Sequence, residues 1–258
     1  FADHTDDELL GYGVEFNFAE EVGAADDRDK AVRQLSRNVK FRQALSYATD
    51  RDGIAQAIMR GPFLRGYAGG LYPGSPLFDK ESVVYYPYDP ESAKILLDEI
   101  GLKDSNGDGV REWSDGPQKG KDVVLQLLAS EDAAETQSVA EALVNQWAAV
   151  GVKLNTRVIN STTGTEINNT GNWDLRVYRG GQNWGLPQVN ITAMAPLTKT
   201  YGTHREGDTP RVMMDFEKQL VEIIEKYRLT FDSAGRADLM KQYQKIFTEN
   251  VYHMGVFS

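Results

Sequence analysis

Residues 122–130 read DVVLQLLAS, and residues 152–158 read VKLNTRV. The first run is almost continuously apolar, as in a strand buried on both faces, and the second alternates between apolar and polar residues. The helical pattern between them is expected to begin at a capping box of Asp132 and Glu135 and to end at Gly151. A strand, a helix and a strand in this order predict two parallel strands with a right-handed crossover. We therefore expect an α/β fold.

Further elements are predicted on both sides of this unit. Residues 12–18 alternate as a strand does, and the acidic residues 26–30 are either a surface loop or the start of a helix. Apolar residues at helical spacing follow four capping positions. These helix starts are Asn38, Asp89 with Pro90, Thr209 with Pro210, and Asp232. Residues 160–172 are polar and rich in Gly, Asn and Thr.

The composition argues against several classes of protein. The chain has 258 residues and a net charge of −10, whereas a nucleic-acid-binding protein needs a basic face. It has no Cys, which excludes disulfides, thiolate metal sites and cysteine nucleophiles. No apolar run approaches the length of a membrane span. Because the chain begins at Phe1 and shows no signal peptide, we expect a fragment or mature piece of a longer protein.

The segment 173–187 carries the candidate ligand-binding residues. It begins as a strand, breaks at Gly180 and Gly181, and is expected to expose polar and aromatic side chains in the loop that follows. Ligands of open α/β sheets bind beyond the carboxyl ends of the strands. The predicted ligand-binding residues are Tyr178, Arg179, Gln182, Asn183 and Trp184. The alternative is an ordinary glycine turn with a half-buried Trp.

Residues 104–115 fit the pattern of a calcium-binding loop. Gly109 stands at position six, where the chain must turn sharply. The ligands would be the side chains of Asp104, Asn106, Asp108, Glu112 and Asp115 and the backbone carbonyl of Val110. At position twelve Asp115 replaces the longer Glu of the usual pattern. The sequence thus predicts a structural Ca²⁺ and no other cofactor, and the alternative is an Asx/Gly-rich turn between a helix and a strand.

The sequence shows no catalytic motif. It has no nucleophile elbow, no HExxH and no Walker loop, and its three histidines, His4, His204 and His253, are scattered. His204 has no partner at metal-ligand spacing and is expected at the surface. The many Asp and Glu residues leave a carboxylate pair open as an alternative. We predict a binding protein and not an enzyme, since binding needs only a shaped cleft.

Several blocks of this sequence resemble the bacterial extracellular solute-binding proteins of family 5, the oligopeptide and dipeptide type. The similar residues are 38–51, 85–97 and 173–187, with Asn17 at the end of a strand. The resemblance implies a two-lobed α/β fold of the periplasmic-binding-protein type II, with a mixed or parallel sheet flanked by helices. This chain would be mainly the second lobe. Residues 1–37 would form an N-terminal strand and acidic connector, and residues 38–258 the second lobe with the calcium-like loop.

The resemblance also implies a function. Such a protein is the substrate-binding component of an ABC importer, which captures a solute in the periplasm by hinge closure and delivers it to a membrane permease. A non-transport module that uses the same lobe for ligand sensing or interaction is the alternative.

The resemblance further narrows the class of solute, which could be a peptide, an oligosaccharide or an opine-like conjugate. Peptide-binding members carry an Asp in the loop after this strand, paired with the amino group of the peptide, and an aromatic residue three positions before it. Here Asn183 and Gly180 stand at those positions. An amide supplies no negative charge to a buried ammonium. We therefore expect a solute without a free α-amine at this subsite, such as an oligosaccharide, an opine-like conjugate or a blocked peptide.

Overall fold

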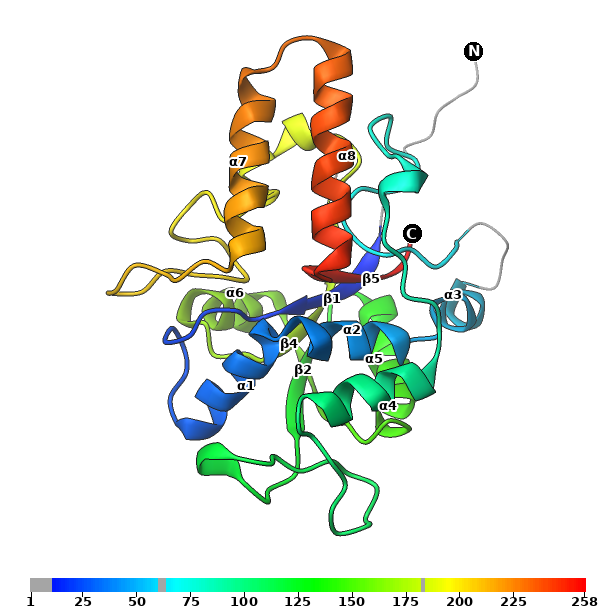
Figure 1. The fold of residues 1–258 in the computed structure, drawn as a ribbon, viewed down its shortest axis with the longest axis vertical. Coiled ribbons are helices and arrows are strands. Elements are labelled where there is room, and N and C mark those ends of the chain that lie inside the picture. Colours follow the sequence, from blue (N-terminus) through cyan, green and yellow to red (C-terminus); the bar gives the residue numbers. More distant parts are fainter. Residues whose placement is uncertain (1–10, 60–63, 182–183) are drawn as a thin grey trace.

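The computed structural model describes residues 11–59, 64–181 and 184–258, which form a mixed five-stranded sheet with helices around it (Figure 1). The strand order is β3-β2-β4-β1-β5. The strands are β1 Tyr12–Phe16, β2 Val124–Ser130, β3 Lys153–Ile159, β4 Leu175–Arg179 and β5 His253–Phe257. β2 runs parallel to β3 and β4, whereas β1 is antiparallel to both β4 and β5. The predicted α/β class with a mixed sheet is confirmed.

The predicted βαβ unit is present. β2 pairs with β3 in parallel along its whole length, and α5, Ala134–Ala148, joins the two strands. Trp147 on α5 is fully buried, and its Nε1 donates a 3.0 Å hydrogen bond to Thr49 Oγ1. Because a buried indole N–H needs a partner, this contact fixes α5 against the helices that precede β2.

The start of α5 differs from the prediction. Asp132 and Glu135 do not form a capping box, because the N-cap residue is Ala133, which has no capping side chain. Asp132 Oδ2 instead accepts a 3.1 Å hydrogen bond from the backbone N–H of Ser161. Asp132 therefore joins the loop after β2 to the loop after β3. Local sequence patterns cannot predict such a long-range contact.

Helices cover both sides of the sheet. Figure 1 shows α7 and α8 as an antiparallel pair on the opposite side of β1 and β5 from α1 and α2. The remaining α-helices are α1 Asp27–Arg37, α2 Val39–Tyr47, α3 Arg51–Met59, α4 Pro90–Glu99, α6 Ser161–Thr170, α7 Asp215–Leu229 and α8 Ser233–Glu249. The described residues also form the short 3₁₀ helices η1 Lys80–Ser82, η2 Gly116–Gln118, η4 Pro187–Val189 and η5 Ile191–Ala193. The side chains of Asn38, Asp89 and Asp232 cap α2, α4 and α8 as predicted.

One helix begins later than predicted, and another was not predicted. The helix expected from Thr209 begins instead at Asp215, because Arg211 holds the preceding loop by donating to the carbonyl oxygens of His204 and Thr198. The polar segment 160–172 forms α6, which Asn160 caps by accepting the N–H of Thr163.

The N-terminal segment belongs to the same sheet and core as the rest of the described chain. β1 lies between β4 and β5, and its inward residues Val14 and Phe16 are fully buried. The acidic stretch 26–30 is the start of α1, with Asp26 as its N-cap. None of the helices in the described ranges combines the length and apolar character that crossing a bilayer requires.

Candidate functional site

The carboxyl ends of three parallel strands meet at one edge of the sheet. β2, β3 and β4 end at Ser130, Ile159 and Arg179, respectively. β4 stops before Gly180, as predicted. Side chains that follow or flank these strand ends therefore form the edge at which α/β sheets bind ligands.

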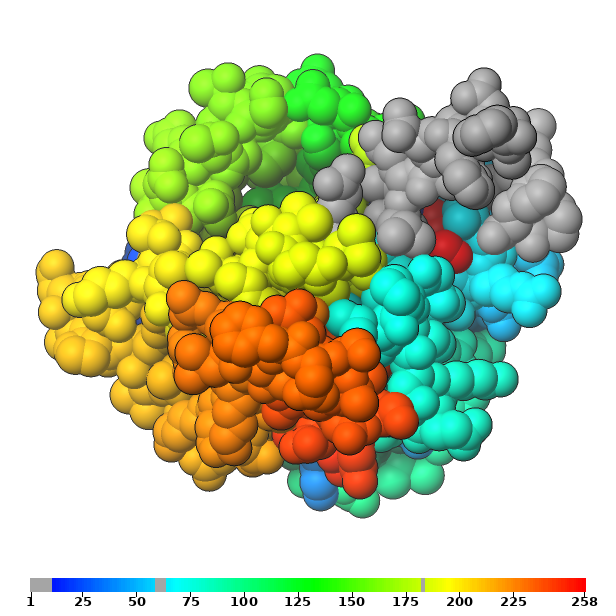
Figure 2. All heavy atoms as spheres, turned by 90° about the horizontal axis from the view of Figure 1, so that it is seen from above, coloured from blue at the N-terminus to red at the C-terminus, as the bar shows by residue number. Residues whose placement is uncertain are grey.

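Two adjoining cavities lie at this edge, and Arg176 contributes to both. The first has a volume of about 450 Å³, and the second about 350 Å³. Figure 2 shows a hollow between the yellow-green segment around residues 160–170 and the yellow segment around residues 190–200. Both volumes fall in the range of small-molecule sites, and their adjacency suits an extended solute.

Three strands contribute titratable side chains to the first cavity. Glu15 on β1 stands opposite Arg176 on β4 and His253 on β5 in the two ladders. Arg176 Nε donates to Glu15 Oε2, and His253 Nδ1 lies 3.7 Å from Glu15 Oε1. Burial acts to raise the pKa of Glu15, but Arg176 and His253 outweigh it and hold that pKa below 4.5. The Glu15 carboxylate is therefore ionised, and the guanidinium of Arg176 compensates its charge.

His253 supplies a neutral imidazole to the same cavity. The side chain is almost fully buried, and burial lowers its pKa to about 4, with Arg176 acting in the same direction and Glu15 opposing. Neither ring nitrogen has a hydrogen-bond partner among the residues that the structure describes. A neutral imidazole has one donor and one acceptor. Both nitrogens are buried, so His253 contributes part of its ring to the cavity wall while its two nitrogens stay unpaired within the described part of the chain.

Aromatic rings hold His253 in place. Its ring centroid lies 5.3 Å from that of Tyr252, 5.4 Å from Phe247, 5.6 Å from Trp184 and 5.6 Å from Tyr178. The imidazole ring stacks on Tyr252 and makes edge-to-face contacts with the other three rings. A ring packed on several sides has one orientation, so the imidazole is held in a fixed position at the cavity wall.

The second cavity lies beside Trp173. The Arg176 guanidinium carbon lies 4.5 Å above the centroid of the Trp173 ring, and Arg176 Nη1 donates a 2.9 Å hydrogen bond to Asn168 Oδ1 on α6. Arg176 is thus fixed by Glu15, Trp173 and Asn168 together. Its position between the two cavities makes it the central cation of the site.

Some of the predicted ligand-binding residues line the first cavity, and others lie outside the described residues. Tyr178 and Arg179 line the first cavity, where Tyr178 Oη lies 3.2 Å from Tyr67 Oη. Gln182 and Asn183 lie outside the described residues.

The expected exposure of Trp184 is wrong. It also lines the first cavity, but only 4% of its surface is exposed, because its ring packs edge-on against Phe247 and His253 and its carbonyl accepts the N–H of Tyr72. Trp184 therefore presents little of its ring surface to the cavity.

Gly180 is required by the packing of Tyr72. A Cβ atom at residue 180 would lie 2.1 Å from Tyr72 Oη and 3.1 Å from Trp184 Cδ1. Tyr72 is almost fully buried and has little room to move. The space that an aromatic residue at position 180 would need is therefore taken by Tyr72, from the long loop between α3 and η1.

Sequence reasoning missed Glu15, Arg176 and His253 as site residues. Each lies in a short strand, and their shared face depends on the pairing of residues about 160 or more positions apart. The local signal is a charged residue between apolar ones in β1 and β4, and β5 has only a single polar residue at its start. Such alternation also describes any solvated strand face.

His204 is not at the surface. It is 1% exposed, and its Nδ1 lies 2.9 Å from both carboxylate oxygens of Glu217, itself fully buried. Tyr252 Oη donates a 2.7 Å hydrogen bond to Glu217 Oε1. This pair joins the loop before α7 to α7 and to the residue before β5. His204 directly follows Thr203, which lines the first cavity, but neither His204 nor Glu217 lines it, so the pair has a structural role.

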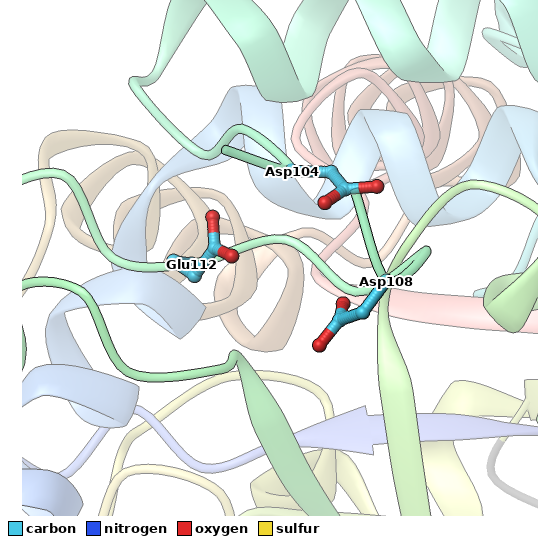
Figure 3. A group of neighbouring side chains, drawn as sticks. All are labelled: Asp104, Asp108 and Glu112. Atoms are coloured by element: carbon cyan, nitrogen blue, oxygen red, sulfur yellow. The ribbon is translucent and has the colours of Figure 1, made fainter. Parts of the chain in front are cut away.

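The calcium-like loop lies between α4 and β2. The structure brings together Asp104, Asp108 and Glu112, which offer one carboxylate oxygen each within 4.8 Å of the others (Figure 3). Asp115 is not part of this group. The chain turns after Glu112 because Trp113 exchanges backbone hydrogen bonds with Gly120 and Lys121, so Asp115 lies in the turn of the next hairpin. Its predicted place as a ligand therefore needs correction.

The sequence matches a known protein family. Residues 3–201 match the family described as "Bacterial extracellular solute-binding proteins, family 5 Middle". The chain is 35% identical to the periplasmic alpha-galactoside-binding protein of Rhizobium meliloti (strain 1021), over 96% of this chain and 36% of that protein.

Solved structures resemble the chain closely. The periplasmic binding protein MelB from Agrobacterium fabrum C58, in complex with stachyose, has a TM-score of 0.94 and 36% identity over 97% of this chain and 38% of that one. The oligopeptide-binding protein AppA from Bacillus subtilis, in complex with a nonapeptide, has a TM-score of 0.75 and 19% identity over 97% of this chain and 45% of its own. The second likeness concerns the fold alone. The chain spans less than half the length of these three proteins.

Proposed function

The chain belongs to the family 5 bacterial extracellular solute-binding proteins, and we propose that it forms one wall of the solute cleft in the binding component of an ABC importer. The cleft of a two-lobed binding protein closes by hinge motion around its solute. The cavities at the carboxyl edge of β2, β3 and β4 would face the second wall. The protein would act in the periplasm and deliver its solute to a membrane permease, without catalysing a reaction.

The proposed solute is an α-galactoside oligosaccharide. The observation that carries this proposal is the likeness to MelB, at 36% identity and a TM-score of 0.94, because that structure holds stachyose. The name of the Rhizobium meliloti relative, at 35% identity, specifies the same class of sugar. Stachyose is neutral and rich in hydroxyl groups, so its binding needs paired donors and acceptors without a net charge.

The charges of the first cavity favour a neutral solute over a free peptide. A peptide ammonium would need an uncompensated carboxylate within a few ångströms. The carboxylate that lines this cavity, Glu15, is already paired with Arg176. Arg179 adds a second guanidinium at the cavity rim, and His253 stays neutral at pH 7. An ammonium would therefore enter a region that carries no surplus of negative charge.

The same residues can bind hydroxyl groups. Thr192, Thr198 and Thr200 line the cavity, and a threonine hydroxyl can both donate and accept a hydrogen bond. Binding a hydroxyl in a closed cleft satisfies polar atoms that would otherwise be buried without partners. A deoxy analogue would leave them unpaired, which would make the site selective for the sugar.

Calorimetry and thermal shift on the purified protein test this proposal. The panel compares stachyose and raffinose with maltotetraose, an opine-like sugar conjugate and a free-amine tetrapeptide. We expect saturable binding of the two α-galactosides and at least about tenfold weaker binding of the others, a difference of about 1.4 kcal/mol. Tighter binding of the tetrapeptide or of the conjugate than of stachyose would overturn the proposed solute class.

A further inference from the structure

The loop between α4 and β2 places a buried carboxylate beside two exposed ones. Asp104 Oδ1 and Oδ2 accept hydrogen bonds from the N–H groups of Gly107 (2.7 Å) and Gly109 (2.9 Å). Asp108 Oδ1 accepts the N–H of Val110 at 2.8 Å. These contacts fold the loop back on itself, so that the carboxylates at positions one and five lie next to that of Glu112.

Glu112 is the unusual member of the group. Only 5% of its surface is exposed, and its Oε2 accepts a 2.7 Å hydrogen bond from the N–H of Ser105. Its Oε1 is buried and has no hydrogen-bond partner within the described ranges, and no basic side chain there lies within ion-pair distance of it. Burying a carboxylate is unfavourable unless a cation or several donors compensate it. The loop therefore lacks one positive partner for Glu112.

The spacing of the three carboxylates matches the size of one cation. Their nearest oxygens lie within 4.8 Å of one another, and Figure 3 shows the carboxylates of Glu112 and Asp108 turned toward each other with that of Asp104 beside them. Ca²⁺–oxygen bonds of about 2.3–2.6 Å put opposite ligands at most about 5 Å apart. One ion between these oxygens can therefore contact all three without a rearrangement of the backbone.

We propose that this loop binds Ca²⁺ through the carboxylates of Asp104, Asp108 and Glu112, with the side-chain oxygen of Asn106 and the backbone carbonyl of Val110 completing the oxygen ligands. The donors are all oxygens, which suit Ca²⁺ and exclude the thiolate and imidazole sites that zinc and copper prefer. Loops of this kind in extracellular modules bind Ca²⁺ with a Kd of about 10⁻⁴–10⁻³ M. Glu112, at position nine, takes the place that a Glu at position twelve has in the usual loop.

The bound ion would stabilise the entry to β2. Glu112 forms antiparallel bridges to Lys103 and to Asp122, two residues before the strand. Arg111 anchors the same segment by donating to the carbonyl oxygen of Val150 at 2.8 Å. Figure 1 shows this loop at the end of the molecule opposite α7 and α8, and none of its residues lines either solute cavity. The ion should therefore change the stability of the protein and leave solute affinity unchanged.

Calorimetric titration with Ca²⁺ alone, and thermal unfolding in 10 mM Ca²⁺ or in EDTA, test the site. We expect one ion per chain and a Tm rise of about 3–6 °C when Ca²⁺ is at about ten times its Kd. Asp108→Asn keeps an oxygen to accept the Val110 N–H but removes one charge, so Ca²⁺ affinity should fall at least about tenfold. Glu112→Gln should abolish the shift while leaving the Tm in EDTA equal to or above that of the wild type, because it removes a buried charge.

Asp115→Asn is the matched control, since Asp115 is a nearby Asp in the turn of the next hairpin, outside the carboxylate group. It should bind Ca²⁺ as the wild type does. A wild-type Tm that does not respond to Ca²⁺, or a full response in Asp108→Asn or Glu112→Gln, would overturn the proposal. A lost response in Asp115→Asn would overturn the proposed set of ligands.

Discussion

Glu15 and His253 face each other across the β1–β5 ladder, with His253 Nδ1 3.7 Å from Glu15 Oε1. At neutral pH the carboxylate is ionised and the imidazole is uncharged, because burial opposes protonation of His253 more than Glu15 favours it. Arg176, on the other side of Glu15, adds to the cost of a second positive charge. The cavity wall is thus set for a neutral imidazole.

The first prediction concerns pH. The pKa of His253 is about 4 in the folded state and near 6.5 in the unfolded chain, so only the unfolded chain binds the proton between these values. The stability that His253 contributes is therefore complete above pH 6.5 and is lost as the pH falls toward 4. Between pH 7 and pH 4.5 the wild type should lose about 2–3 kcal/mol more than His253→Phe. Urea unfolding at several pH values measures both, and equal losses would contradict the prediction.

The second prediction concerns Gly180. Gly180→Ala should destabilise the protein by about 1–3 kcal/mol, because its Cβ would lie 2.1 Å from Tyr72 Oη in a packed region. Gly164→Ala is the matched control, since its Cβ would meet only Ile159 Cδ1 at 3.6 Å within α6. Alanine favours helix, so the control should gain about 0.5–1 kcal/mol. Chemical denaturation of both variants tests the pair, and a neutral Gly180→Ala would show that Tyr72 moves freely.

The third prediction concerns Glu217. Glu217→Gln should cost about 3 kcal/mol, because it removes a fully buried charge partner of His204 and weakens the bonds to Tyr252 and the N–H of Met214. Glu225→Gln, which loses an ion pair with Arg228 that is half exposed, should change stability by less than about 0.5 kcal/mol. Equilibrium unfolding of the two variants under the same conditions makes the comparison. Similar costs for both would mean that burial does not strengthen the His204–Glu217 pair.

Much of the fold could be predicted from the sequence because its signals are local. The spacing of apolar residues within short segments predicts the strand 124–130, the helix that follows it and the strand 153–159. α6 was missed although its ends carry recognisable signals. Asn160 caps its start, and Gly171 ends it with a φ of +73°. Only one residue of α6, Ile167, is buried, so the segment has no apolar stripe at helical spacing. Its polar composition therefore hid the helix despite the capping residues at its ends.

The candidate site was less predictable because it is made by strand pairing. Tyr178 and Arg179 follow from their place at the end of a predicted strand. The pairing of strands that are distant in sequence places Glu15, Arg176 and His253 next to one another, and the sequence of any one strand does not reveal that pairing. Trp184 shows the reverse problem. Its sequence neighbours predict an exposed loop, but Phe247 on α8 and Tyr72 on the long loop enclose it.

The pairing of β1 with β5 has a consequence for folding. β1 is formed by residues 12–16, but one of its two neighbours in the sheet is made of residues 253–257. Contacts between such distant segments form slowly, because a long loop must close first. During synthesis β1 has an open edge until these late residues are available, and open edges promote aggregation. The two strands are therefore held apart in sequence by more than two hundred residues, and β1 stays open on one side until β5 pairs with it.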